Sequence, residues 1–173
     1  AEEFNAFESF NYPHLVDAGI NITYHTERML KPDWDKPMIP HFKLDNNVII
    51  FSLFPGIRED LVRHVIATPN LKSIVMRTFG SGNAPQRPWV MHALKEATHN
   101  GKVVINISQC IQGAVEMGRY DTGYQLQEAG VISGYDSTVE NAVTKLMYLQ
   151  SIFDDPETVR YYMRQSIRGE ITV

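Results

Sequence analysis

The sequence predicts an α/β domain built on a parallel sheet of about four strands, with helices on both faces and an extended linker before it. The first observation is that short apolar runs alternate with amphipathic helical segments over residues 47–173. The second is that these runs are apolar at successive positions, which is typical of parallel strands covered on both faces. The third is that residues 1–46 lack sustained periodicity and carry prolines every few residues, as a linker does.

The first strand, the first helix and the second strand follow one another directly. The run VIIFSL at 48–53 has the length of a strand, and Pro55 and Gly56 end it. Residues 59–67 are expected to be helical, because their apolar residues fall on one helical face: Leu61, Val62, Val65 and Ile66. Residues 73–79 form a second buried strand, which ends at the glycine-bearing loop 80–87.

The middle of the chain repeats this pattern. Residues 89–100 predict a helix, and Gly101 suits its end because glycine readily takes the left-handed conformation there. Residues 102–107 predict the third strand. The polar loop 108–123 and a short helix at 124–129 then lead through Gly130 to a fourth strand at 131–133.

Two helices are expected to close the chain. Ser137 and Glu140 have the spacing of a capping box, which places a helix start at Ser137. Asp155 and Pro156 have the pattern of an N-cap and first helical residue, so a last helix should run to about residue 165. Within the linker, only residues 20–24 alternate as a short strand does.

Composition argues against several classes of function. The chain has 173 residues and a net charge of −4 with both signs interspersed, so we expect neither nucleic acid nor a membrane as a partner. The single Cys110 excludes an internal disulfide and fits the reducing cytoplasm. The six histidines show no ligand spacing, so we expect no metal and no cofactor. The missing initiator methionine fits a processed chain or a piece of a longer protein.

The loop GSGNAP at 80–85 begins like a nucleotide-binding turn. A dinucleotide loop needs a third glycine where this chain has Pro85, and there is no Walker lysine, so we do not expect a nucleotide. Gly80 and Gly82 instead allow close approach to Asn83, whose carboxamide offers a donor and an acceptor to an amino-acid or amide ligand. The alternative is that Asn83 only caps the next helix or closes the turn.

The loop 108–123 follows the third strand, and ligands of such sheets bind beyond the carboxyl ends of the strands. Both loops therefore share the edge where we expect a small-ligand site. Cys110 has no histidine in its loop to activate it, so we interpret it as a packing residue and not as a nucleophile. The residues alone give no catalytic set.

Several short motifs follow one another along nearly the whole chain: FNAFES at 4–9, NYP at 11–13, GSGNAP at 80–85, SQC at 108–110 with Gly113, GRYDTG at 118–123, AGVI at 129–132, TVE at 138–140, KL at 145–146 and RGE at 168–170. Together these motifs resemble one family, the bacterial L-asparaginases, and in particular their cytoplasmic, type I branch. The resemblance implies a Rossmann-like C-terminal domain at 47–173. Residues 1–46 would then be the end of an N-terminal domain and the interdomain linker.

The resemblance also implies that the whole protein hydrolyses L-asparagine to L-aspartate and ammonia. In this family the threonine nucleophile and the groups that assist it belong to the N-terminal domain. No catalytic residue is therefore expected in this chain, which should be inactive alone. Its implied partners are L-asparagine, the missing N-terminal domain and further copies in a dimer or tetramer.

Roles for individual loop residues follow from the same resemblance. The family's G-x-G-N loop reaches into the active site of a neighbouring subunit, which implies that Asn83, presented by Gly80 and Gly82, helps to hold the substrate. In type I relatives, the arginine before this loop and a Thr/Ser-Gln-Cys turn resemble parts of a second, regulatory asparagine site. The matching residues here are Arg77, Ser108 and Cys110. The alternative is that Arg77 pairs with a nearby acid and that Cys110 fills the core. The acidic residue that secreted relatives contribute has no clear match in this chain.

Two other functions stay open at this point. One is a freestanding domain that senses a small ligand such as an amino acid. The other is part of a tRNA-dependent amidotransferase subunit, since those proteins share the fold, although their work on tRNA needs domains absent from this chain. An upstream Gly-Thr-Gly-Gly-Thr loop would favour the asparaginase.

Overall fold

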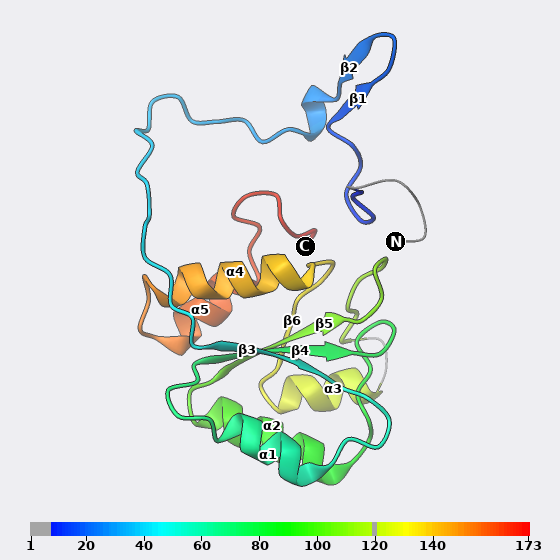
Figure 1. The fold of residues 1–173 in the computed structure, drawn as a ribbon, viewed down its shortest axis with the longest axis vertical. Coiled ribbons are helices and arrows are strands. Elements are labelled where there is room, and N and C mark those ends of the chain that lie inside the picture. The colour runs from blue at the N-terminus through cyan, green and yellow to red at the C-terminus, as the bar shows by residue number, and fades with distance from the viewer. Residues whose placement is uncertain (1–7, 119–120) are drawn as a thin grey trace. The chain divides into compact units, whose positions relative to one another are not determined.

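The computed structural model describes residues 8–118 and 121–173, which fall into two compact units, Ala1–His41 and Phe42–Val173 (Figure 1). The first part of the FNAFES motif, at 4–7, lies outside the described residues. So do Arg119 and Tyr120 of the GRYDTG motif.

In the first unit the chain forms a small antiparallel hairpin. Strand β1 (Val16–Ala18) pairs with β2 (Ile22–Tyr24), and a single 3-10 turn, η1 (Thr26–Arg28), follows. The predicted strand at 20–24 is confirmed over its last three residues. Strand β1 was not predicted, because a stretch of that length is too short to show alternation. None of residues 8–41 is buried, so the described part of this unit has no hydrophobic core of its own.

In the second unit four parallel strands form one sheet in the order β3-β4-β5-β6: β3 (Val48–Ser52), β4 (Ser73–Thr78), β5 (Val103–Ser108) and β6 (Ile132–Ser133). Three helices connect the strands: α1 (Glu59–Ile66), α2 (Pro88–His99) and α3 (Asp121–Glu128). Two more follow the last strand: α4 (Val139–Gln150) and α5 (Pro156–Met163). The predicted four-stranded parallel α/β fold is confirmed.

The sheet separates two hydrophobic layers, because successive side chains of a strand point to opposite faces. On β4, Ile74 and Met76 pack with buried residues of α1, α2 and α3, such as Leu126. The intervening Val75 packs with α4 and α5, among them Leu146. Figure 1 shows the same division, with α1, α2 and α3 on one side of the sheet and α4 and α5 on the other. This two-sided burial explains why the strands are continuous apolar runs.

Several helix ends differ from the predicted ones. Helix α1 ends at Ile66 and not at 67, α2 lies one residue before the predicted 89–100, α3 ends at Glu128 and not at 129, and α5 ends at Met163 and not at about 165. Helix α4 starts one residue later than predicted, because the N-cap is Thr138, whose hydroxyl accepts from the N–H of Asn141 at 3.2 Å. Ser137 instead accepts from Asn141 Nδ2 at 2.6 Å, so the prediction of a cap at Ser137 is wrong. Helix α3 starts earlier than predicted, at the residue after the undescribed pair. The start of α5 at Asp155 is as predicted.

The last residues of the chain are fixed to α4 by a buried ion pair. Lys145 Nζ lies 2.6 Å from Glu170 Oε1, and the two side chains are 5% and 16% exposed. Glu170 also accepts hydrogen bonds from the backbone N–H groups of Ile167, at 3.0 Å, and of Arg168. Burial acts to raise the pKa of Glu170, but these donors and Lys145 together outweigh it and lower the pKa to about 2. The KL and RGE motifs are therefore joined by this ion pair, which holds the end of the chain against α4.

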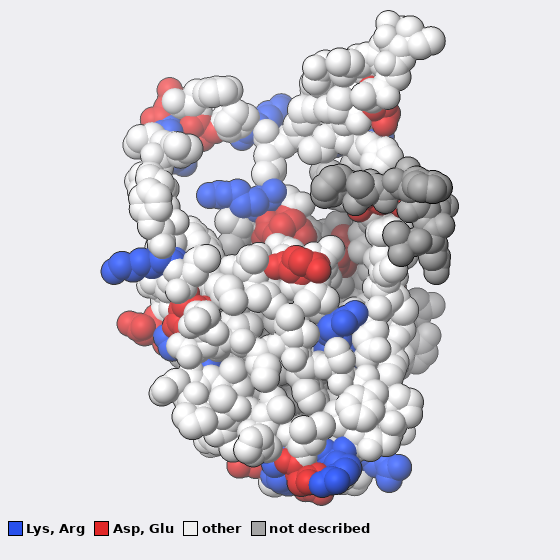
Figure 2. All heavy atoms as spheres, viewed as in Figure 1, with Lys and Arg blue, Asp and Glu red and all other residues white. Residues whose placement is uncertain are grey.

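On the face of the molecule that Figure 2 draws, acidic and basic side chains are scattered among uncharged residues, and its described part shows no large area of a single sign. Neighbouring pairs include Arg63 Nε with Glu59 Oε1 and Lys72 Nζ with Asp45 Oδ2, both at 2.8 Å. Over the described residues, no helix combines the length and apolar character needed to cross a membrane.

Candidate functional site

The glycine-bearing loop closes as a tight turn at the carboxyl end of β4. Phe79 N–H donates to Asn83 O at 2.9 Å, and Asn83 N–H donates back to Phe79 O at 2.8 Å. Between them, Gly80 and Gly82 have φ angles of 50° and 107°. A Cβ added to Gly82 would lie 2.7 Å from Val115 Cγ1, whereas the space beside Gly80 is open. Conformation therefore requires glycine at both positions, and packing requires it at Gly82 as well.

Two fully buried polar side chains, from β4 and β5, connect this turn to the sheet by hydrogen bonds. Thr78 and Asn106 are both 0% exposed. The Thr78 hydroxyl donates to Asn106 Oδ1 at 2.6 Å, and Asn106 Nδ2 donates to Gly82 O at 3.0 Å. Because a buried polar group without a partner is costly, this chain of bonds fixes β4, β5 and the turn in one arrangement.

The side chain of Asn83 is held by helix α3. The hydroxyl of Thr122, which is 8% exposed, donates to Asn83 Oδ1 at 2.8 Å. Helix α2 has Arg87 at its N-cap and no side-chain cap, so the alternative that Asn83 caps this helix is wrong. Asn83 does close the turn, but it does so through its backbone. Its half-buried side chain is therefore not needed to close the turn.

The loop after β5 is joined to the same turn. The Ser108 hydroxyl donates to Gly80 O at 2.6 Å and accepts from the N–H of Cys110 at 2.9 Å. Cys110 is exposed, so the prediction that it fills the core is wrong. The physical reason is its position beyond the end of β5, outside both helical layers.

Arg77 lies near the end of β4 but belongs to the other face of the sheet. It is in register with Ile107, which packs in the layer of α4 and α5, whereas Thr78 is in register with Ser108. Arg77 Nε is buried and has no hydrogen-bond partner, and no ion pair among the described residues includes Arg77. The alternative that Arg77 pairs with an acid is therefore not observed in the described part of the chain.

The structure thus brings together most, but not all, of the residues that the sequence singled out. Gly80, Gly82, Asn83 and Ser108 meet at the carboxyl edge of the sheet, where the loops after β4 and β5 lie side by side (Figure 1). Whether they bind a ligand stays a prediction. Sequence reasoning missed three residues that support them: Thr78, Asn106 and Thr122. Asn106 carried a usable signal, because it is the one polar residue inside the apolar run 103–107.

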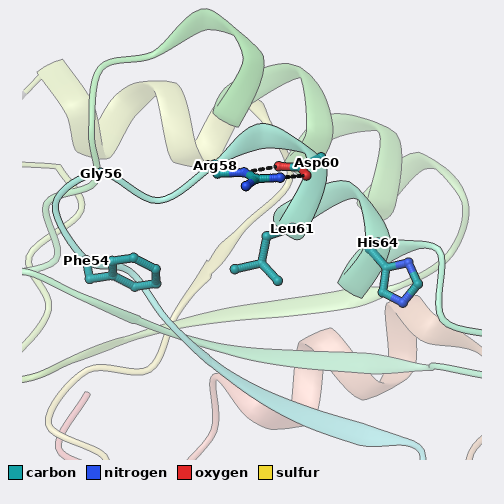
Figure 3. Close-up of a pocket in the computed structure, with 6 residues that line it drawn as sticks. All are labelled: Phe54, Gly56, Arg58, Asp60, Leu61 and His64. Atoms are coloured by element: carbon teal, nitrogen blue, oxygen red, sulfur yellow. Dashed lines mark hydrogen bonds and ion pairs between the residues drawn. The ribbon is translucent and has the colours of Figure 1, made fainter.

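A surface groove of about 580 Å³ lies at the start of α1, away from this turn. It is lined by Phe54, Gly56, Arg58, Asp60, Leu61 and His64. Figure 3 shows Leu61 between Phe54 and His64, with the Arg58–Asp60 ion pair to one side. The hydrogen bond from Arg58, with Nε at 2.9 Å from Asp60 Oδ1, holds the pKa of Asp60 below its ordinary value. Since these two charges satisfy each other, we assign no ligand to the groove.

Metal chemistry finds no support in the described residues, since none of their His, Cys, Asp and Glu side chains gather in a group that could hold a metal ion.

Comparison with known proteins gives consistent matches. Residues 47–163 match the family model described as the glutaminase/asparaginase C-terminal domain. The chain is 42% identical over 172 residues to L-asparaginase 1 of Escherichia coli K12, covering 99% of this chain and 50% of that protein. It is 38% identical over 176 residues to the 60 kDa lysophospholipase of Homo sapiens, covering 99% of this chain and 30% of that protein.

A solved structure agrees with these matches. The crystal structure of L-asparaginase I from Vibrio cholerae superimposes with a TM-score of 0.84 at 41% identity, covering 98% of this chain and 51% of that one. The chain therefore spans about half the length of the bacterial relatives that it matches.

Proposed function

Because the chain belongs to the glutaminase/asparaginase family and contains its C-terminal domain, we propose that the whole protein is an L-asparaginase that converts L-asparagine to L-aspartate and ammonia. The observation that carries this proposal is the turn at 79–83. It holds the carboxamide of Asn83 at the carboxyl edge of a parallel sheet, where small ligands of such folds bind. The 42% identity to a protein named L-asparaginase 1 supports the same substrate.

In this proposal the chain supplies ligand-binding groups and the other half of the protein supplies the nucleophile. The present sequence has no Gly-Thr-Gly-Gly-Thr loop. A threonine hydroxyl of the other half attacks the amide carbon of asparagine, the C–N bond breaks and ammonia leaves. Water then hydrolyses the resulting ester and releases aspartate. This chain alone should therefore be inactive.

Asn83 acts, in our proposal, in the active site of a neighbouring subunit of a cytoplasmic dimer or tetramer. Replacing Asn83 by alanine should lower kcat/KM by the equivalent of roughly 1–3 kcal/mol, because a buried polar partner is stranded. Unchanged kinetic constants in that variant would return Asn83 to the role of a turn former. Mixing Asn83→Ala chains with chains inactivated in the other half should raise kcat/KM above that of Asn83→Ala alone, if the two groups meet across a subunit boundary.

We also propose that Arg77, Ser108 and Cys110 belong to a second, regulatory asparagine site. The unpartnered Nε of Arg77 supports it, because a guanidinium grips a carboxylate with two parallel hydrogen bonds. Since the Ser108 hydroxyl is bonded to Gly80 O, a ligand that engages Ser108 would act directly on the substrate-binding turn. Cys110 would contact the ligand as a small neighbour and not as a nucleophile.

The decisive experiment measures ammonia release by the whole protein from L-asparagine and from L-glutamine. We expect release from asparagine by the whole protein and none by the 173-residue chain. Release by the short chain would contradict the placement of the nucleophile. Tight amino-acid binding by the whole protein without any hydrolysis would favour the sensor function instead.

A further inference from the structure

The turn at 80–83 directs its oxygen atoms inward. Gly80 O accepts from the Ser108 hydroxyl at 2.6 Å, and Gly82 O accepts from Asn106 Nδ2 at 3.0 Å. Ser81 O accepts from the N–H of Glu116 at 2.9 Å. Asn83 Oδ1 completes the set, since it accepts from Thr122 at 2.8 Å. The acceptors of the turn are thus used within the domain.

The donor side of Asn83 is free by comparison. Among the described residues, no hydrogen bond involves Asn83 Nδ2, and the side chain is half-buried and not enclosed. A hydroxyl has one proton, and the proton of Thr122 is given to Oδ1. In this arrangement the carboxamide oxygen faces helix α3, and the NH2 group lies on the side of the amide away from Thr122.

Helix α3 holds Thr122 in place. Its next residue, Gly123, packs so closely on the loop before it that an added Cβ would lie 2.1 Å from Met117 O. One turn further along the helix, Leu126 is 0% exposed in the layer that also contains Met76 of β4. The Thr122 hydroxyl thus approaches Asn83 from a fixed element and not from a mobile loop.

We propose that Thr122 is a positioning residue that holds the carboxamide oxygen of Asn83, so that the NH2 group, and not the oxygen, faces the substrate. This inference rests on the proposed function of Asn83. An NH2 group can only donate, so the substrate group that it contacts is an acceptor: the α-carboxylate or the side-chain carbonyl, and not the ammonium. Thr122 itself does not touch the substrate.

The test combines single and double variants of the whole protein. Thr122→Val removes the hydroxyl at nearly constant shape, and we expect kcat/KM for asparagine to fall about tenfold. Thr122→Ser keeps the donor and should stay within about twofold of the unmodified protein. In an Asn83→Ala background, Thr122→Val should change kcat/KM by less than about twofold, because Thr122 acts only through Asn83.

Thr98 provides the matched control. It is also a buried helical threonine, 9% exposed, whose hydroxyl donates to Ala129 O at 2.6 Å, and among the described residues none of its hydrogen bonds involves the turn. Thr98→Val should lower the unfolding temperature and leave kcat/KM unchanged. An equal loss of kcat/KM in Thr98→Val and Thr122→Val would show that both act through stability, which would overturn the inference.

Further outcomes separate this inference from the proposed function. If Asn83→Ala leaves kcat/KM unchanged, the role of Asn83 and this inference both fail. Only the inference fails if Asn83→Ala lowers kcat/KM but Thr122→Val does not. It also fails alone if Thr122→Val lowers kcat/KM by the same factor in the unmodified protein and in the Asn83→Ala background.

Asn83→Asp gives a test that needs no change at Thr122. It keeps an acceptor for Thr122 but presents an oxygen to the substrate, so it should lose at least as much as Asn83→Ala. Full activity of Asn83→Asp would overturn the orientation.

Discussion

Replacing Glu170 by glutamine should destabilise the protein by about 3 kcal/mol near neutral pH, and this loss should shrink as the pH falls. The carboxylate of Glu170 faces the ammonium of Lys145 at 2.6 Å and accepts from the backbone N–H groups of Ile167 and Arg168. A carboxamide keeps one acceptor for these groups but loses the charge. The buried ammonium of Lys145 is then left without a counter-charge.

The magnitude follows from the pKa of Glu170. Burial works against ionisation, but the backbone donors and Lys145 lower the pKa from 4.5 to about 2. A shift of about 2.5 pH units corresponds to about 3 kcal/mol at about 1.4 kcal/mol per unit. Because the folded-state pKa lies below the unfolded one, the stabilisation is fully present above about pH 4.5. It is lost as the pH falls from there towards about 2.

The assay is urea unfolding of the unmodified protein and of Glu170→Gln at several pH values between about 7 and 3. Hydrogen exchange at the amides of Ile167 and Arg168 reports the same loss locally, since both donate to Glu170. Glu96→Gln is the control, because Glu96 is 51% exposed and pairs with Arg63 at 3.2 Å, so its loss should stay below about 1 kcal/mol. A stability difference that does not change with pH, or one no larger than in the control, would refute this reasoning.

Three further predictions concern the turn and the regulatory site. Gly82→Ala should destabilise the protein by about 3 kcal/mol and Gly80→Ala by only about 1 kcal/mol. Both positions have a positive φ, but only at Gly82 would the added Cβ also clash with Val115, so equal unfolding midpoints would contradict this prediction. Asn106→Ala strands the Gly82 carbonyl and leaves the Thr78 hydroxyl only its longer bond to Ile107 O, so it should lower the free energy of unfolding by about 1–3 kcal/mol in urea titration. Arg77→Ala should turn a sigmoidal dependence of rate on asparagine into a hyperbolic one, and hyperbolic kinetics in the unmodified protein would leave the regulatory site without support.

The strands and helices of the second unit could be predicted because each depends on a local pattern. Strands β4 and β5 are buried on both faces, and burial on both faces produces the continuous apolar runs at 73–79 and 102–107. Helix α5 could be placed because Asp155 caps it within three residues along the chain. The start of α4 was misplaced by one residue because Ser137 and Thr138 are both good caps, and the choice between them depends on Asn141.

The candidate site could be predicted only as far as its loops. The hydrogen bonds that build it join residues 24, 28 and 39 positions apart, and no local pattern reports such a contact. Thr122 looks like any threonine of a polar loop, because the predicted helix began only at residue 124. Cys110 looks like a core residue because cysteine is usually buried, but its exposure depends on where the chain goes after β5.

The way in which the turn is held supports the proposal that Asn83 serves the active site of a neighbouring subunit. A loop that must be ordered when the substrate binds spends part of the binding free energy on its own ordering. Here the Ser108, Asn106 and Thr122 side chains each donate to one oxygen of the turn, and they come from the end of β5, its interior and helix α3. Two of the three donors are less than a tenth exposed, so water competes little for these bonds. The turn is therefore ordered without a ligand, so in the proposed site the binding energy of the substrate would stay available for the reacting amide.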